Sequence, residues 1–264
     1  MEAIRVGDLV VQPVFDGTAL LTADMWAGAD WTGHRHLLRD DDSMLVPVGG
    51  FLVRIGDRLV LLDAGVGDLH NEMFEGGRFL DSLRGLGVAP TDIDTVIVSH
   101  LHSDHMGWLA TSEGSTFPNA TIHVGSADWE HFVEQGHGGE RRVGLLRKVE
   151  AQVSLIESDE ATIAPGVTAR HTPGHTPGHT STVLSSGDER LIVLGDALHC
   201  PAQLTEPEWQ FVFDVDPVLA ARTREGLLRE AEDDGTALLP CHFPGMQAAR
   251  LLPGEGTRRW QLAG

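Results

Sequence analysis

The segment SHLHSDHMG, residues 99–107, holds most of what the sequence says about fold and chemistry. Within six residues it presents four side chains of the kinds that bind zinc-like ions, namely His100, His102, Asp104 and His105. These groups could not all leave water without a cation to offset them. The β-branched run TVIV at residues 95–98 precedes the segment and is typical of a buried strand. The sequence therefore predicts a metal site where this strand ends, rather than a solvated histidine-rich loop.

The composition is that of a globular enzyme. The 264 residues can bury one large core or two halves packed together. No apolar run approaches the roughly 20 residues that span a bilayer, and the start MEAIR lacks the basic end and apolar stretch of a signal peptide. The two cysteines, Cys200 and Cys241, are too few for a disulfide framework. We therefore expect a cytoplasmic protein.

The chain is strongly acidic, with a formal net charge of −20. Such a surface repels nucleic-acid phosphates, whereas nucleic-acid binding normally requires basic patches. We expect a small-molecule substrate as the partner, and neither nucleic acid nor a membrane. A homodimer remains open, because the sequence does not fix an oligomeric state.

Strand-like runs recur along the whole chain. The expected strands span residues 9–15, 45–55, 58–62, 95–98, 121–124, 152–156, 167–171, 180–184, 191–194 and 237–239. A hairpin turn at Gly56 and Asp57 joins the second strand to the third. Pro13 limits the first strand to a sheet edge at best.

Helix-like runs alternate with these strands. Helices are expected at residues 77–86 before a stop at Gly87, from Ser126 onward, and from an N-cap at Asp216 to Gly235. We infer one α/β domain over residues 1–264, in which helices cover two β-rich layers. We also expect a helical insertion or lid near residues 126–150.

The residues HLHSDH at 100–105 resemble the H-x-H-x-D-H signature of the metallo-β-lactamase-fold hydrolases. Further segments of that family occur in the same order: LLDAG at 61–65, TPGH at 172–175, GD at 195–196 after an apolar run, and His242. The resemblance covers residues from about 45 to 245. It implies a four-layer αβ/βα sandwich of two mixed β-sheets flanked by helices, with metals at one edge of the sheets. It also implies hydrolysis of small esters, lactones, thioesters or phosphoesters.

The resemblance implies two divalent metal ions and assigns their ligands by position. The first ion would take His100, His102 and His175, the second would take Asp104, His105 and His242, and Asp196 would bridge the two. Zinc is the expected metal, and manganese, cobalt and iron also accept this ligand set. In HTPGHTPGH, residues 171–179, His175 falls where the family has its ligand. His179 and Asp63 would support the ligands from behind rather than bind an ion.

The implied mechanism uses a hydroxide that bridges the two ions, so no serine or cysteine nucleophile is needed. Asp104 would orient this hydroxide or carry its proton to the leaving group. The segments GDALH at 195–199 and CHFPG at 241–245 are similar to the branch of N-acyl homoserine lactonases and methyl-parathion hydrolases. Those lactonases have a tyrosine three residues after the bridging aspartate, where His199 stands in this tyrosine-free chain. A histidine can donate the same hydrogen bond, so His199 is predicted to be catalytic.

Other residues give weaker signals. Trp26, Trp31 and Phe51 are predicted to line an apolar pocket over the metals. Cys200 and Cys241 flank ligand segments, but the histidine and aspartate set is complete without them. This favours buried thiols that behave as small apolar groups.

The leading hypothesis is a dinuclear metal-dependent hydrolase that opens a lactone or cleaves a small ester. Three alternatives remain: an organophosphate triester hydrolase, an iron-dependent enzyme that oxidises a thiol or persulfide on the same fold, and a metal-containing binding protein without turnover. Relatives that oxidise thiols typically bind one metal and lack part of the second ligand set. Asp104, His105 and His242 are all present here, which favours hydrolysis.

Overall fold

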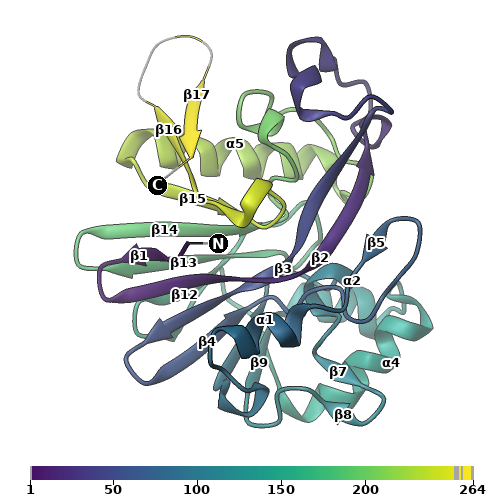
Figure 1. The fold of residues 1–264 in the computed structure, drawn as a ribbon, viewed down its shortest axis with the longest axis vertical. Helices are drawn as coiled ribbons and strands as arrows, with labels where there is room; N and C mark the ends of the chain where they lie inside the picture. The colour runs from purple at the N-terminus through teal and green to yellow at the C-terminus, as the bar shows by residue number, and fades with distance from the viewer. Residues whose placement is uncertain (1, 253–255, 257, 263–264) are drawn as a thin grey trace.

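The computed structural model describes residues 2–252, 256 and 258–262. Two large sheets pack against each other, and helices cover their outer sides (Figure 1). The first sheet has the strand order β1-β2-β3-β4-β6-β9-β10, with β5 beside β2. Its strands are β1 (Ile4–Val6), β2 (Leu9–Thr22), β3 (Ser43–Ile55), β4 (Arg58–Leu62), β5 (Phe74–Glu75), β6 (Thr95–Val98), β9 (Thr121–Gly125) and β10 (Val153–Ile156).

The second sheet runs in chain order from β11 to β17. Its strands are β11 (Glu160–Ala164), β12 (Val167–His171), β13 (Thr180–Ser186), β14 (Glu189–Gly195), β15 (Ala237–Pro240), β16 (Ala249–Leu252) and β17 (Arg259–Leu262). A separate hairpin joins β7 (Ala110–Thr111) and β8 (Gly114–Ser115). The α-helices are α1 (Phe79–Gly85), α2 (Ser103–Met106), α3 (Ser126–Trp129), α4 (Gly139–Val149) and α5 (Pro217–Asp234). Shorter helical turns span Ala23–Met25, Trp31–Leu37, Pro90–Asp92, Glu130–Glu134, Glu150–Gln152, Pro201–Leu204 and Pro244–Met246.

Both sheets mix parallel and antiparallel pairs, as predicted. In the first sheet, β4, β6, β9 and β10 are parallel neighbours, whereas β1 to β4 pair antiparallel. In the second sheet, β14 and β15 are parallel and the other neighbours are antiparallel. Parallel strands have their carboxyl ends at one edge, where loops can bring side chains together. The loops after β6, β14 and β15 carry candidate ligands.

Three apolar layers hold the sandwich together. The middle layer lies between the sheets and contains residues of both, such as Phe51 and Leu239. An outer layer packs α1 and α4 on the first sheet, and another packs α5 on the second. In β6, Val96 and Val98 belong to the layer under the helices, whereas Ile97 belongs to the middle layer. Both faces of β6 are therefore buried from Val96 to Val98, which explains the apolar run at these three positions.

The first strand differs from the expectation in length and position. It continues to Thr22, because β2 pairs with β3 along its whole length. It is also not a sheet edge, since β1 pairs with residues 9–11 and β5 with residues 18–19. Pro13 falls between these two stretches, so its missing N–H interrupts neither outer ladder.

The helix and turn signals are confirmed. The Asp216 carboxylate accepts a hydrogen bond from the Leu219 amide at 2.9 Å and begins α5, which ends at Gly235 with φ +69°. Gly87, with φ +73°, follows α1, and Ile55 pairs with Arg58 across the predicted hairpin turn. Helices also occupy residues 126–134 and 139–149. Their role as a lid stays a prediction.

Within residues 2–252, 256 and 258–262, no helix is long and apolar enough to span a membrane.

Candidate metal centre

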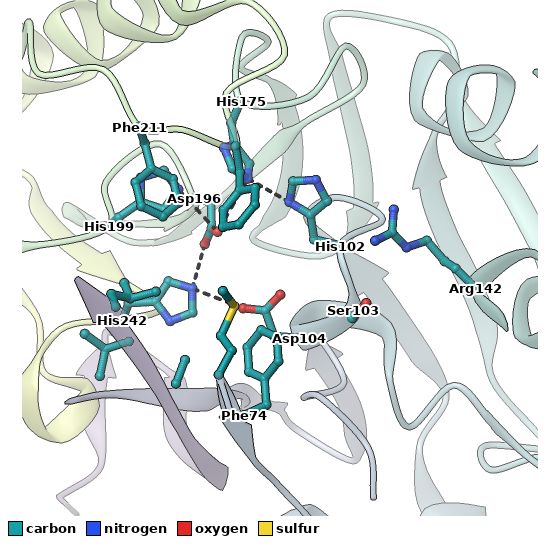
Figure 2. A pocket seen from close by; sticks show the side chains of 15 residues that line it. Phe74, His102, Ser103, Asp104, Arg142, His175, Asp196, His199, Phe211 and His242 are labelled. Carbon is teal, nitrogen blue, oxygen red and sulfur yellow. Dashed lines mark hydrogen bonds and ion pairs between the residues drawn. The ribbon is translucent and has the colours of Figure 1, made fainter. Parts of the chain in front are cut away.

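Seven side chains that the sequence assigns to metal ions converge at one end of the sandwich. We call them the ligand cluster: His100, His102, Asp104, His105, His175, Asp196 and His242. The first four lie between the end of β6 and the end of α2, and the others follow β12, β14 and β15. Figure 2 shows His102, Asp104, His175, Asp196 and His242 pointing toward one another. The structure thus brings together all seven residues.

Asp196 lies at the centre of the ligand cluster. Its Oδ2 is 3.8 Å from His100 Nε2 and 3.6 Å from His175 Nε2. Its Oδ1 is 3.2 Å from His105 Nε2 and 3.1 Å from His242 Nε2. The two oxygens of one carboxylate therefore face two different sets of histidines. This is the arrangement that a carboxylate needs in order to bridge two ions.

The remaining ligands complete a set on each side of Asp196. On one side, His102 Nδ1 lies 2.9 Å from His175 Nε2, and His100, His102 and His175 offer atoms that all lie within 4.8 Å of one another. On the other side, Asp104 Oδ2 lies 3.6 Å from His242 Nε2 and 3.7 Å from His105 Nε2. Each set has the nitrogen and oxygen donors that zinc-like ions prefer.

Unpaired polar atoms within the cluster support a fit to cations. His100 Nε2, His105 Nε2 and Asp196 Oδ1 are buried without a hydrogen-bond partner among the described residues. Buried polar atoms are nearly always satisfied in folded proteins, so each such atom needs an explanation. One ion at each ligand set would give these atoms a partner, His100 Nε2 in the first set and His105 Nε2 with Asp196 Oδ1 in the second.

The first set consists of neutral imidazoles. Burial lowers the pKa of His100, His102 and His175 well below the ordinary value, and neighbouring histidines lower it further. A neutral imidazole has a free lone pair, which is the form that binds a metal. These three residues are therefore in their metal-binding form near neutral pH.

The second set lies in a strongly acidic environment. Burial alone would lower the pKa of His105, but the carboxylates of Asp196, Asp104 and Asp63 raise it well above the ordinary value. The pKa of His242 is also raised, against burial, by Asp196 and Asp104. Burial would raise the pKa of Asp196, but His105 and His242 lower it well below its ordinary value. This field favours positive charge at the site, which a divalent ion supplies.

Asp63 supports the second set from behind, as the sequence predicts. One of its oxygens accepts a hydrogen bond from the Ser99 amide at 2.7 Å. The other lies 2.9 Å from both His105 Nδ1 and Ser99 Oγ. The contact fixes the His105 ring with Nε2 toward Asp196. Asp63 adopts φ +61°, a left-handed conformation that aspartate and asparagine tolerate better than most residues.

Other ligands are held in the same way. His179 Nε2 accepts a hydrogen bond from the Asp196 amide at 3.0 Å, so this predicted support residue fixes the backbone of the central carboxylate. His242 Nδ1 donates to the Pro47 carbonyl at 2.9 Å. His175 Nδ1 donates to Asp214 Oδ1 at 2.8 Å. Sequence reasoning did not assign a role to Asp214.

Asp128 is a second buried carboxylate that the sequence did not single out. It accepts hydrogen bonds from the Leu101 amide at 2.9 Å, Thr176 Oγ1 at 3.0 Å and the Gly178 amide at 2.6 Å. It thereby ties the loop after β6 to the loop that carries His175. Burial raises the pKa of Asp128 to about 6, although these hydrogen bonds oppose the shift.

His199 lies beside the ligand cluster. Its Nε2 is 3.5 Å from Asp196 Oδ2, and its ring packs on Phe211 with ring centroids 4.0 Å apart. Both ring nitrogens are buried without a hydrogen-bond partner among the described residues. His175, Asp196 and His199 also form a group whose ligand atoms lie within 4.8 Å of one another. The ring can therefore interact with a ligand above the cluster or with an ion in it.

The two cysteines are buried free thiols. Burial raises the pKa of both Cys200 and Cys241 to about 12. Cys241 Sγ lies 3.7 Å from Asp63 Oδ2, at the back of His105. Cys241 and Cys200 both belong to apolar clusters, in agreement with the prediction that they pack as small apolar groups.

A cavity of about 200 Å³ opens above the ligand cluster. Its outer wall consists mainly of apolar side chains together with one arginine: Leu21, Val46, Phe74, Arg142, Phe211 and Phe213. Figure 2 shows Phe211 beside His199, Phe74 next to Asp104, and Arg142 on the side of His102 and Ser103. The pocket is therefore apolar at one end and cationic at the other.

The aromatic residues predicted to line this pocket do not reach it. Phe51 lies on β3, and its side chain is buried between the two sheets. Trp26 and Trp31 belong to an apolar cluster behind the cavity. Trp26 packs against Phe211, with ring centroids 4.9 Å apart, so it supports a lining residue without lining the pocket. That prediction is wrong, because these large rings are core residues.

Comparison with known families identifies the arrangement. The model of the family "Metallo-beta-lactamase superfamily" matches residues 46–242. The chain belongs to this superfamily. The match includes all seven residues of the ligand cluster, and it agrees with the fold and the branch that the sequence motifs predict.

Several curated relatives are similar in sequence. An N-acyl homoserine lactonase of Bacillus cereus is 27% identical over 208 residues, which are 70% of this chain and 78% of that protein. Metallo-beta-lactamase domain-containing protein 1 of Homo sapiens is 28% identical over 177 residues, which are 65% of this chain and 55% of that protein. The chain therefore spans about half the length of the human relative.

Solved structures share the whole fold. AidC, described as a dizinc quorum-quenching lactonase, is 23% identical with a TM-score of 0.87, and the match covers 100% of this chain and 97% of that chain. The hydrolase AbOPH is 23% identical with a TM-score of 0.82, and the match covers 98% of this chain and 95% of that chain. At this level of identity the matches show a common fold.

Proposed function

We propose that this protein is a dinuclear metal-dependent hydrolase that opens a lactone or cleaves a small ester, with zinc as the expected metal. The observation that carries the proposal is the position of Asp196, whose two oxygens face two complete sets of ligands. When bound, a pair of divalent ions supplies an activated water and polarises the substrate carbonyl. The names of the lactonase relatives support this reaction class.

Asp104 is proposed to handle the proton. Its carboxylate lines the cavity and also faces His105 and His242. A carboxylate in this position can accept a proton from the attacking water and pass it to the leaving oxygen. Asp104 and Asp196 line the same cavity, so a substrate bound over Asp196 is within the cavity that Asp104 faces.

His199 is proposed to bind the carbonyl oxygen of the substrate. Its ring lies over Phe211 and beside Asp196, with both nitrogens free of protein partners in the described part of the chain. An N–H directed at the carbonyl oxygen stabilises the negative charge that develops there. The apolar end of the pocket, with Phe74, Phe211 and Phe213, suits an acyl or alkyl group.

The setting of the reaction is proposed from the same features. A small molecule is the partner, because the cavity of about 200 Å³ admits little more than the reacting part of a substrate. The free thiols fit a reducing compartment such as the cytoplasm. The oligomeric state, including the homodimer left open by the sequence, is to be measured.

One combined experiment tests the proposal. Purified protein is analysed for metals and then assayed with a lactone, a carboxylic ester, a phosphotriester and, with oxygen uptake as readout, a persulfide. We expect two ions per chain and hydrolysis of the lactone or the carboxylic ester that a chelator abolishes and zinc restores. Preferred hydrolysis of the phosphotriester would replace the ester proposal with the organophosphate alternative. One ion with oxygen uptake would favour thiol oxidation, and two ions without turnover would favour a binding protein.

A further inference from the structure

Arg142 is the one lysine or arginine among the residues that line the cavity. It lies on α4, within the segment predicted to be a lid, and lines the cavity together with Ser103 and His102. Figure 2 shows its side chain reaching toward the cavity from the side of His102, opposite His199 and Phe211. The pocket therefore has a fixed positive charge at the end away from its aromatic wall.

The guanidinium of Arg142 has no acidic partner within ion-pair distance among residues 2–252, 256 and 258–262. Its Nε is buried without a hydrogen-bond partner in that part of the chain. The group makes a cation–π contact, because its central carbon lies 5.0 Å from the centroid of the Phe132 ring. A guanidinium has five N–H donors, and in this half-buried position they are available to a bound ligand.

Arg224 is a fully buried arginine with a structural role, and its contacts differ from those of Arg142. Arg224 donates from Nε to the Ala197 carbonyl at 2.7 Å, and from Nη1 to the Pro207 and Trp209 carbonyls at 2.6 and 2.8 Å. Its Nη2 also lies 3.9 Å from Asp214. Arg224 thus holds several loops together, whereas Arg142 makes no hydrogen bond of this kind.

The acidic groups nearest to Arg142 are already engaged. Asp104 and Asp128 are the carboxylates that act on its charge. Asp128 accepts its three hydrogen bonds from Leu101, Thr176 and Gly178, and Asp104 belongs to the ligand cluster. Among the described residues no carboxylate is free to pair with the guanidinium, so a bound anion could replace the water at its exposed N–H groups.

We propose that Arg142, with the Ser103 hydroxyl beside it, binds an anionic oxygen group of the substrate, a carboxylate or a phosphate. A guanidinium binds either group through paired N–H donors. The inference rests on the proposed hydrolase function and narrows its substrate. The ester or lactone cleaved over Asp196 carries an acidic group at the end that faces α4. A neutral lactone would offer the guanidinium only uncharged oxygens, which make weaker hydrogen bonds than a carboxylate or a phosphate.

The first test measures binding, which does not depend on turnover. Zinc-loaded protein is titrated calorimetrically with dicarboxylates from malonate to adipate, with their half-amides, and with the corresponding phosphonocarboxylates. At the best chain length, we expect a diacid to bind about tenfold or more tightly than its half-amide, as a charge-assisted hydrogen bond would give. A larger gain from the phosphonocarboxylate would identify phosphate as the preferred group, and a larger gain from the dicarboxylate would identify carboxylate.

The matched variants are Arg142→Gln and Arg141→Gln. Arg141 is exposed on the same helix and does not line this cavity. Arg142→Gln should remove most of the preference for the diacid, Arg142→Lys should keep part of it, and Arg141→Gln should keep all of it. Metal content and the circular dichroism spectrum show whether each variant is folded and loaded. Equal binding of diacid and half-amide by the wild type, or an equal loss in both arginine-to-glutamine variants, would overturn the inference.

The second test uses turnover. Monomethyl glutarate and dimethyl glutarate differ by one carboxylate, and the ratio of their kcat/KM values should favour the acid ester in the wild type. Arg142→Gln should lower that ratio about tenfold, mainly through KM. An unchanged ratio would contradict the proposed role of Arg142. If no ester is cleaved by any variant, the hydrolase proposal fails while the titration still decides what Arg142 binds.

Discussion

The ligand cluster and the outer wall of the same cavity are built differently. In the cluster, buried groups hold the ligands from behind: Asp63 holds His105, and Asp214 holds His175. In the outer wall, Arg142 has a single aromatic contact, and Phe213 is 45% exposed. The cluster is therefore fixed in geometry, whereas Arg142 and Phe213 in the wall have few contacts that a substitution would break.

This difference separates two aspects of function. A fixed set of ligands determines which ions bind and which reaction is possible, since positioned groups give most of the catalytic effect. Wall residues touch the parts of the substrate that do not react, so they determine which molecule enters. Changes in the cluster should affect metal content and all substrates together. Changes in the wall should affect one substrate against another and leave the metals in place.

The largest effect is expected from Asp196→Ala. This change removes the carboxylate that faces both sets of histidines, so metal content and activity should fall together, with kcat/KM reduced about a thousandfold or more. Elemental analysis and steady-state kinetics measure the two quantities. Asp188→Ala, in the β13–β14 turn, is the control and should retain both. Full metal occupancy in Asp196→Ala would refute the bridging position.

A smaller effect is expected from Asp63→Asn. Asparagine tolerates the positive φ at this position, but the change weakens the hold on His105 Nδ1. Metal affinity should fall about 10- to 100-fold, with the loss confined to one of two ions. Competition with a chelator measures it, and Asp57→Asn in the exposed β3–β4 turn serves as the control. Equal affinity in both variants would show that Asp63 is a turn residue without influence on the metals.

His199→Phe tests the boundary between the two regions. The ring should still pack on Phe211, so both ions should stay bound, while kcat for the preferred ester should fall about tenfold to a hundredfold through loss of the N–H donor. Metal analysis and kcat on one preparation separate the outcomes. Loss of an ion would make His199 a ligand and move it into the cluster. Undiminished turnover would remove its catalytic role.

The smallest effect is expected in the wall, from Phe213→Ala. Phe213 contacts the cavity at its apolar end and packs edge-on against Phe211, with centroids 5.5 Å apart. KM for substrates with a long acyl chain should rise about threefold to tenfold, as expected for one partly buried side chain. Substrates with a short chain should show little change, and metal content should stay constant. A parallel loss on both substrate classes would contradict the division between cluster and wall.

Four residues of the ligand cluster could be predicted directly from the sequence because they lie close together in the chain. His100, His102 and His105 lie within one short segment, and the turn residues around α5 have fixed chemistry at fixed positions. The burial of β6 on both faces follows from the layers that pack against it, and the apolar run at residues 96–98 already implies it. The family resemblance then supplied His175, Asp196 and His242.

The rest depends on contacts between distant segments. Asp214 holds His175 across 39 residues, and Asp128 holds Thr176 across 48. Neither pair leaves a periodic signal in the sequence. Trp26 and Phe51 have the composition of pocket residues, but tertiary packing placed them in the core. Arg142 occurs in a polar helix that gives no sign of which residue faces the cavity.

The position of the metals tests the central claim most directly. Crystals of the zinc-loaded protein, measured on both sides of the zinc absorption edge, would show each ion by its anomalous scattering. The account predicts two peaks per chain, one among His100, His102 and His175 and the other among Asp104, His105 and His242, with Asp196 between them. A single peak, or a peak at the alternative group of Asp63, His105 and Cys241, would contradict it.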